Sequence, residues 1–202
     1  MRWWIGIRDC LPISFALDFD RKDGNPDLEK TKIGKLRKGA KPYDRSPNKE
    51  HYEAAEKLAE KCINFLKRVE CYNSLDTIVA VPPSTPEKKY SLPAVIARHI
   101  AEEWERDDFS EAVKKVKETK QAKNVALEKK LGNIEGSIEV HSKVKGRKIL
   151  LTDDLYQSGI TMNYVAMLLL EQGARKIYGL ACEKTCSNDD NISREIDSGF
   201  YD

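Results

Sequence analysis

Two adjacent carboxylates and a short hydroxyl-bearing turn form the part of this sequence best suited to chemistry. Asp153 and Asp154 follow an apolar run, and Ser158, Gly159 and Thr161 come shortly after them. A turn that opens a helix presents unpaired backbone N–H groups which, with the helix dipole, suit a phosphate monoester. Gly159 would let the backbone approach the anion, and the two hydroxyls would add donors. The expected phosphate site comprises Tyr156, Gln157, Ser158, Gly159, Ile160 and Thr161.

The acid pair must serve another part of the same ligand, because carboxylates repel a phosphate. Asp153 and Asp154 can instead accept hydrogen bonds from the two hydroxyls of a ribose. An acid pair at a strand end is also common in receiver-like and other α/β proteins, where it is simply solvated. The hydroxyl-bearing turn and the helix after it favour the ligand site, and a ribose 5-phosphate is the ligand they imply.

The elements around this segment follow a strand–helix–strand order. The short apolar runs Thr77–Val81 and Lys148–Thr152 are typical of strands buried on both faces of a parallel sheet, and Lys176–Cys182 gives a third strand. Residues 138–140 predict a further short strand. Because ligands bind beyond the carboxyl ends of such strands, the acids lie where an open α/β sheet places its crevice.

Three helices are predicted between these strands. Apolar residues recur at helical spacing from Asn48 to Val69. Ser91 offers an N-cap with Pro93 in the first turn, and a helix from about Gly159 to Gln172 stops at Gly173. Its inward positions are expected to be Val165, Ala166, Leu169 and Leu170. Residues 20–49 are expected to be loops with at most short elements, and the basic segment 31–41 to be a solvated loop or a hood over the site.

Composition limits the class of protein. Of the 202 residues, 40% are apolar and the net charge is +2, so a core can form and the whole chain gives no case for nucleic acid. No stretch reaches the roughly 20 apolar residues of a membrane span, so no membrane partner is expected. Five cysteines without paired spacing favour reduced thiols and a cytoplasmic protein. We expect one α/β domain over residues 1–202, with a mainly parallel central sheet flanked by helices, a core at 75–182 and a variable or hood-forming region at 1–50.

The segment Asp153–Thr161 resembles the signature of the type I phosphoribosyltransferases, in which a hydrophobic strand, two acids and two further residues precede Thr-Thr-Gly-any-Thr. This resemblance implies the family's fold with a flexible hood, and binding of 5-phosphoribosyl-1-pyrophosphate (PRPP) with Mg²⁺ held through the ligand. Gln157 stands at the place of the first Thr, where the purine-salvage branch has an aspartate that accepts the proton of the base. Glutamine cannot do this, so a hypoxanthine or guanine enzyme is not expected.

Upstream residues resemble the competence protein F (ComF) type of phosphoribosyltransferase. The match comprises Thr119, Gln121, Leu127, Lys130, the run 133–138 and the run 144–148, without the amino-terminal zinc finger and with Ile138 in place of an aromatic residue. The fold implied by the resemblance places a pyrophosphate loop after the first parallel strand, at Pro83, Ser84, Lys88 and Lys89. A plain Pro-rich turn with solvated lysines is the alternative. The Lys-rich stretch 114–130 would form the mobile hood, or simply a solvated helical face.

The function expected from this resemblance is transfer of the 5-phosphoribosyl group to a nitrogenous base with release of pyrophosphate, by an enzyme that could be a homodimer. Asp153 and Asp154 would hold the ribose and favour an oxocarbenium-like centre. A non-catalytic PRPP- or nucleotide-binding regulator of DNA uptake or defence is the alternative. A nucleic-acid-handling protein, based on the Lys-rich stretch 114–130 alone, is a third and weaker one.

Overall fold

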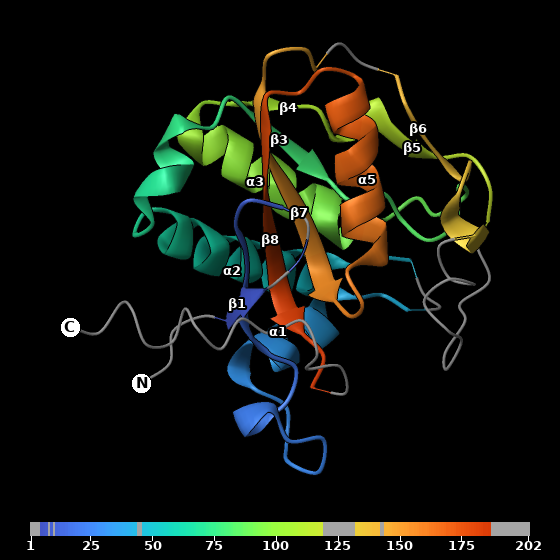
Figure 1. Ribbon diagram of the computed structural model, residues 1–202. Helices are drawn as coiled ribbons and strands as arrows, with labels where there is room; N and C mark the ends of the chain where they lie inside the picture. Colours follow the sequence, from blue (N-terminus) through green and yellow to red (C-terminus); the bar gives the residue numbers. More distant parts are fainter. Residues whose placement is uncertain are drawn as a thin grey trace.

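A six-stranded sheet forms the centre of the protein (Figure 1). The computed structural model describes residues 5–7, 9, 11–43, 46–118, 132–141 and 144–186. The sheet has the order β1-β2-β8-β7-β3-β4; β1 is antiparallel to β2, and the other neighbours are parallel. Its strands are β1 (Ile5–Ile7), β2 (Ser14–Phe19), β3 (Thr77–Ala80), β4 (Asp107–Asp108), β7 (Lys148–Tyr156) and β8 (Lys176–Lys184). The expected α/β class with a mainly parallel sheet is confirmed.

Alternate residues of the central strands face two different cores. Ile78 and Leu150 belong to the core on one face of the sheet, whereas Val79 and Leu151 belong to the core on the other. Burial on both faces explains why these strands read as continuous apolar runs. The first face is covered by α1 (Lys32–Ala40), α2 (Lys49–Leu66) and α3 (Leu92–Trp104), and the second by α5 (Ile160–Glu171).

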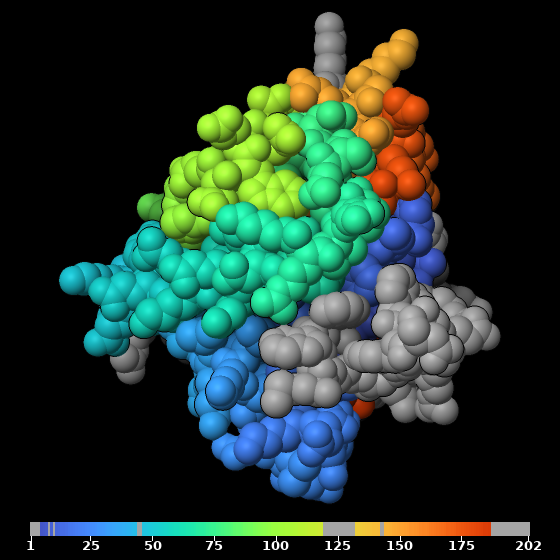
Figure 2. Space-filling model, turned by 90° about the vertical axis from the view of Figure 1, so that its left-hand side faces the viewer, coloured from blue at the N-terminus to red at the C-terminus, as the bar shows by residue number. Residues whose placement is uncertain are grey.

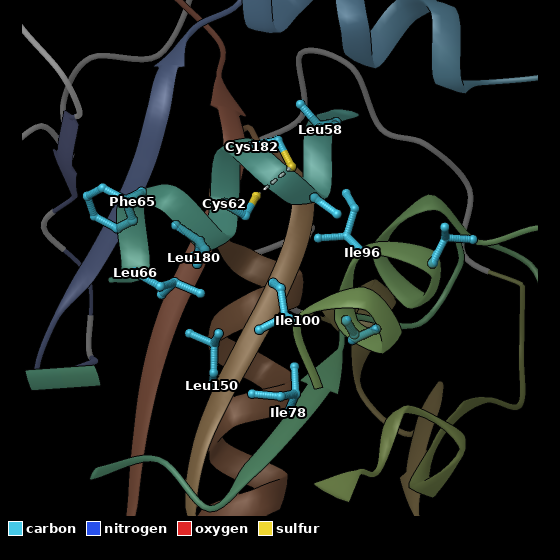
Figure 3. Packing of buried hydrophobic residues seen from close by; sticks show 14 of the residues in the cluster. Leu58, Cys62, Phe65, Leu66, Ile78, Ile96, Ile100, Leu150, Leu180 and Cys182 are labelled. Carbon is cyan, nitrogen blue, oxygen red and sulfur yellow. Dashed lines mark hydrogen bonds between the residues drawn. The ribbon is translucent and has the colours of Figure 1, made fainter. Parts of the chain in front are cut away.

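The core under α2 and α3 is closely packed (Figure 3). Leu58 and Leu66 of α2 and Ile100 of α3 are fully buried against the sheet. Cys62 of α2 and Cys182 of β8 meet in this core, with their Sγ atoms 3.8 Å apart. Both thiols are free. On the outer surface, α2 spreads across the molecule in blue-green below α3, with the blue segment that contains α1 beneath it (Figure 2).

The predicted helices form with small shifts at their ends. Asn48 caps α2, which ends at Leu66 and is followed by the 3₁₀ segment Glu70–Ser74. The Ser91 hydroxyl caps α3 by accepting from the backbone N–H of Ala94 at 3.3 Å, as its sequence predicts. Leu170 was expected to face inward from α5 but is 49% exposed. The helix is apolar nearly all round, so the 3.6-residue period does not single out its inner face.

The amino-terminal region departs most from expectation. Residues 20–49 contain α1 and the 3₁₀ turn Lys22–Gly24 rather than loops alone, and β2 precedes them. The Thr31 hydroxyl starts α1 by accepting from the backbone N–H of Gly34 at 3.0 Å. β2 lies beside β8, so the beginning of the described chain pairs with its end. The basic segment 31–41 is therefore largely a helix that packs on the sheet, not a solvated loop.

A small second sheet lies beside α5. It pairs β5 (Val113–Lys115) with β6 (Ile138–Val140) in antiparallel register and follows the 3₁₀ turn Ser110–Ala112. The strand predicted at 138–140 is thus confirmed, but it does not join the central sheet. Most of the Lys-rich stretch and the ComF-like positions Thr119, Gln121, Leu127 and Lys130 lie outside the described residues. No helix in the described ranges is long and apolar enough to cross a membrane.

Candidate functional site

The acid pair lies within a strand rather than in the turn after it. We expected the strand to end at Thr152, but β7 continues to Tyr156 because Asp153, Leu155 and Tyr156 stay in register with β8. The turn is consequently short, at residues 157–159, and α5 begins at Ile160. The carboxylates are thereby carried by a strand that stays paired with β8, a more rigid support than a loop provides.

Gly159 is required by the protein's own packing. It is the N-cap of α5 with φ 73°, a backbone conformation that favours glycine. A Cβ there would overlap the Tyr156 phenol and lie 3.0 Å from the Asn163 side-chain nitrogen. The Tyr156 hydroxyl donates in turn to the Asp9 carboxylate at 3.3 Å, on the β1–β2 connection. We expected a glycine at position 159 because it would let an anion approach the backbone. The Tyr156 ring beneath the turn is a second reason for glycine at this position.

The acids and the turn share one cleft of about 620 Å³. Its floor is the end of β7, and its sides come from the first turn of α5, the loop after β3, and the end of α1. The expected site residues that line it are Asp153, Asp154, Gln157, Ser158, Ile160, Thr161, Pro83, Ser84 and Lys88. Three expected residues do not line it: Tyr156 is buried with its ring under the turn, Gly159 is covered, and Lys89 lines a neighbouring cleft.

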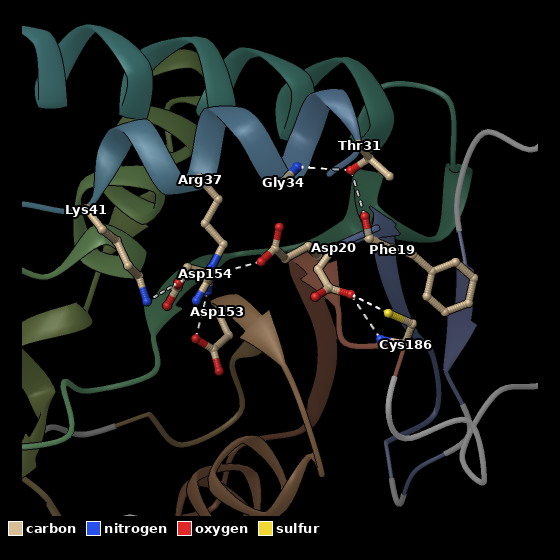
Figure 4. A network of polar contacts seen from close by, with 10 residues as sticks. Phe19, Asp20, Thr31, Gly34, Arg37, Lys41, Asp153, Asp154 and Cys186 are labelled. Atoms are coloured by element: carbon tan, nitrogen blue, oxygen red, sulfur yellow. Dashed lines mark hydrogen bonds and ion pairs between the residues drawn. The ribbon is translucent and has the colours of Figure 1, made fainter. Parts of the chain in front are cut away.

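Two cations from α1 and its C-terminal end hold the second acid (Figure 4). Asp154 Oδ2 lies 2.5 Å from Arg37 Nε and 2.6 Å from Lys41 Nζ. Arg37 also bridges to β8 through Nη1, which lies 2.6 Å from Glu183 Oε1. The side chains of Arg37, Asp154 and Glu183 are 11%, 10% and 1% exposed. This is a buried ion-pair network, so each charge depends on its partners for stability.

The network gives the two acids opposite proton affinities. Burial and the neighbouring charge of Asp154 raise the pKa of Asp153 to about 7. Burial acts the same way on Asp154, but the charges of Arg37 and Lys41 outweigh it and hold the pKa of Asp154 below its usual value. At neutral pH, Asp154 is therefore a fixed anion and Asp153 is close to its titration midpoint.

Several cleft residues were not among those expected from the sequence. Lys115 is 8% exposed and its amine donates to the Ser137 hydroxyl at 2.9 Å; burial lowers its pKa. The Thr185 hydroxyl oxygen is buried at the cleft and has no hydrogen-bond partner within the part of the chain that the structure describes. Arg37 and Lys41 belong to the basic segment 31–41, which was expected to be a solvated loop or a hood over the site. Lys115 lies in the Lys-rich stretch 114–130, which was expected to form a mobile hood or a solvated helical face. Thr185 carries no sequence signal, because a single Thr is informative only once the fold surrounds it.

Mg²⁺ fits this cleft only as an ion carried by its ligand. Across the described ranges, no group of three or more His, Cys, Asp and Glu residues could hold a metal ion. The acid nearest the cationic helix is already neutralised by Arg37 and Lys41. A diphosphate would have to supply most of the oxygen ligands that Mg²⁺ requires.

Comparisons with known proteins give likenesses only at low similarity. No family model matches the chain, and no curated protein matches it. Among solved structures, the PRPP synthetase of Mycobacterium smegmatis is 18% identical with a TM-score of 0.42, over 65% of this chain and 35% of the synthetase. Glutamine PRPP amidotransferase from B. subtilis is 14% identical with a TM-score of 0.46, over 66% of this chain and 28% of that protein.

A Leishmania tarentolae HGPRT-ase solved with GMP is 17% identical with a TM-score of 0.34, over 65% of this chain and 64% of that one. This chain thus spans about a third or less of the synthetase and the amidotransferase. Scores of this size do not identify a family.

Proposed function

We propose that this protein binds PRPP with Mg²⁺ and transfers its 5-phosphoribosyl group to a nitrogenous base, releasing pyrophosphate. The observation that carries the proposal is the shared cleft: an acid pair, a hydroxyl-bearing turn and the start of a helix line one cavity at the carboxyl end of a parallel sheet. That arrangement suits a ribose 5-phosphate, because its hydroxyls need acceptors and its phosphate needs donors.

Each part of PRPP has a proposed contact. Ser158, Thr161 and the backbone N–H groups from Gln157 onward would bind the 5-phosphate. Asp153 and Asp154 would accept from the ribose hydroxyls. Asp154 retains this capacity because both of its cations contact Oδ2, which leaves Oδ1 available.

The diphosphate would lie along the loop after β3, beside Pro83, Ser84 and Lys88. Lys89 would contact it only after moving out of the neighbouring cleft. Mg²⁺ would neutralise charge on the leaving diphosphate as the glycosidic bond breaks. We further propose the ComF type as the nearest branch, on the residues that its pattern shares with positions 133–138 and 144–148.

Calorimetric titration with PRPP and MgCl₂ tests this binding. The double variant Asp153→Asn/Asp154→Asn should lose PRPP affinity, since each charge-assisted hydrogen bond is worth roughly 1.5–3 kcal/mol. The matched control is Asp23→Asn/Asp27→Asn, which removes the same charge from exposed positions outside the cleft. Circular dichroism shows whether both variants keep their helices. Equal PRPP affinity in both variants would contradict the ribose assignment.

A non-catalytic sensor of PRPP or of a nucleotide is the second candidate. Gln157 favours it, since this residue stands where a proton acceptor is found in the purine-salvage branch and cannot accept a proton itself. Pyrophosphate release from PRPP, measured with a panel of free bases, separates the two functions. An enzyme releases pyrophosphate in proportion to one added base, whereas a sensor binds PRPP and releases none.

A further inference from the structure

The cations of α1 divide the acid pair into two unlike groups. Arg37 and Lys41 both contact Asp154, at 2.5 and 2.6 Å. Asp153 forms no ion pair with any residue that the structure describes. Its carboxylate accepts from backbone N–H groups, that of Asp154 at 2.7 Å and that of Leu155. Figure 4 shows its carboxylate directed away from Lys41 and Arg37. One acid is thus held permanently charged, and the other is free to exchange a proton.

The proposed transfer requires a proton acceptor, because a nitrogenous base loses an N–H proton as its nitrogen bonds to the ribose. The described lining of the cleft contains no histidine, cysteine or glutamate. Tyr90 is unsuitable, since its hydroxyl donates to the Ala40 carbonyl at 2.8 Å and burial raises its pKa to about 12. Tyr43 and Lys88 also line the cleft, but both are exposed to solvent. Arg37 and Lys41 are paired with Asp154. The less exposed candidates that remain are Asp153, Asp154 and the amine of Lys115.

Two of these three candidates are engaged elsewhere. Asp154 would have to give up its contacts with Arg37 and Lys41 before it could be protonated. The Lys115 amine is directed at the Ser137 hydroxyl, 2.9 Å away, within the β5–β6 sheet. Asp153 has no such partner, and a carboxylate has about four acceptor positions, so it can hold a ribose hydroxyl and still take a proton.

We propose that Asp153 is the proton acceptor of the transfer reaction, and that Arg37 and Lys41 make this possible by keeping Asp154 ionised. This inference rests on the proposed function. In the step, the nitrogen lone pair of the base forms the bond to ribose C1′, and the bond from C1′ to the diphosphate oxygen breaks with its electrons leaving on the diphosphate. The N–H proton passes to Asp153 and leaves to water after the product has gone.

The surroundings of Asp153 are consistent with this role. The charged groups that face it are Asp154 on its own strand and Lys41 at the end of α1, with Arg37, Lys88 and Lys115 also lining the cleft. Burial and Asp154 raise its pKa to about 7, while Lys41 opposes the rise. A group with a pKa near the working pH is the most efficient general base.

Substitution of the charged residues around Asp153 tests this role, because a merely structural Asp153 would not make the pH dependence of turnover respond to them. Turnover with saturating PRPP and MgCl₂ is measured against pH, with adenine as the first acceptor because it does not titrate near neutrality. We expect a rising limb with a midpoint near pH 7 that is absent in Asp153→Asn, together with a roughly 10²- to 10⁴-fold loss of rate. Asp154→Asn should move the midpoint to lower pH and Lys41→Met to higher pH. The control Lys57→Met, on the outer face of α2, should leave it unchanged.

A second measurement separates this inference from the proposed function. Carbon NMR of protein labelled at aspartate carboxyl groups reports the titration without any acceptor base. One carboxyl should titrate near pH 7 and should be missing in Asp153→Asn. Its midpoint should fall in Asp154→Asn.

The possible outcomes distinguish the role of Asp153 from the proposed enzymatic function. The absence of any carboxyl titrating between pH 6 and 8 would overturn the inference, even if the protein proves to be a transferase. A transferase whose rising limb survives in Asp153→Asn would overturn it as well. Binding of PRPP without turnover of any base would overturn the enzymatic function instead.

Discussion

The two walls of the cleft are built in opposite ways. The β7–α5 wall comes from one continuous segment, 153–161, in which the positions of the lining residues follow from one strand, one turn and one helix start. The α1 wall reaches Asp154 through Arg37, which lies 117 positions away in the chain and also contacts Glu183, 146 positions away. The first wall supplies the groups that would contact a ligand, and the second sets their charge. The acid pair and its turn can therefore be recognised in the sequence, whereas the charge state of the acids depends on α1, which the sequence does not reveal.

Removal of the acid that joins the two walls should have the largest effect. Asp154→Asn leaves Arg37 and Lys41 buried without that carboxylate. We expect the free energy of unfolding to fall by about 3–5 kcal/mol, as for other buried pairs that lose one partner. Urea unfolding at pH 7.5 measures it, with Asp27→Asn as the exposed control. A loss as small as in the control would mean that α1 is not held by this network.

Asp153→Asn should raise the free energy of unfolding, and it should do so at neutral and higher pH but not at acidic pH. The folded-state pKa of Asp153, about 7, exceeds its ordinary value of 3.8, so the stability that it contributes when protonated is lost as pH rises through 7. The variant, which has no charge to bury, should gain up to ~4 kcal/mol over the wild type at pH 8, since each pKa unit is worth about 1.36 kcal/mol. The gain should vanish near pH 4. A pH-independent difference between the two proteins would show that Asp153 does not titrate as described.

Two glycines with similar backbone angles differ in what surrounds them, which tests the role of packing in the β7–α5 wall. Gly159 and Gly146 have φ 73° and 77°, but a Cβ at Gly146 would have no heavy atom within 4 Å, whereas one at Gly159 would overlap Tyr156. Gly146→Ala should cost about 1–2 kcal/mol for its left-handed backbone. Gly159→Ala should cost a further ~1–3 kcal/mol for overpacking and should weaken binding of ribose 5-phosphate. Thermal unfolding measures the stability of the two variants, and calorimetry measures their binding of ribose 5-phosphate. Equal losses of stability would show that contact with Tyr156 does not require glycine at position 159.

The smallest expected effect concerns Gln157, an exposed residue of the turn. Gln157→Thr exchanges one donor for another and should keep PRPP affinity within about tenfold, or ~1.4 kcal/mol. Gln157→Asp adds a negative charge beside the proposed 5-phosphate and should weaken PRPP more. If the Asp variant instead gains transfer to hypoxanthine or guanine, the cleft is a purine-salvage site that lacks only its usual proton acceptor, and the ComF type is the wrong branch.

Most of the β7–α5 wall could be predicted because its signals are local. Apolar runs marked β3, β7 and β8, Ser91 marked the start of α3, and two acids before a hydroxyl-bearing turn marked the cleft. The end of β7 was misplaced because polar residues interrupt the apolar run, while pairing with β8 carries the strand four residues further.

The α1 wall was missed for a related reason. A helix is recognised from its apolar inner face, yet α1 directs Arg37 toward the sheet, and Lys41 follows at its C-terminal end. Their partners are acids that become close neighbours only in the finished fold. Local propensity contains no information on such long-range pairing, and so the basic segment was predicted to be a solvated loop or a hood rather than a helix.

The pairing of β2 with β8 also has a consequence for how the chain matures during synthesis. Arg37 reaches its partner Glu183 only after 146 further residues have been added, which takes roughly 7–30 s at usual elongation rates of ~5–20 residues per second. Until then, β2 has no β8 to pair with and α1 has no strand ends to dock on. In the nascent chain, β2 and α1 therefore lack their partner β8 at a time when β3 and α3 have already been synthesised. The cleft can form only after β8, the last strand among the described residues, has been synthesised.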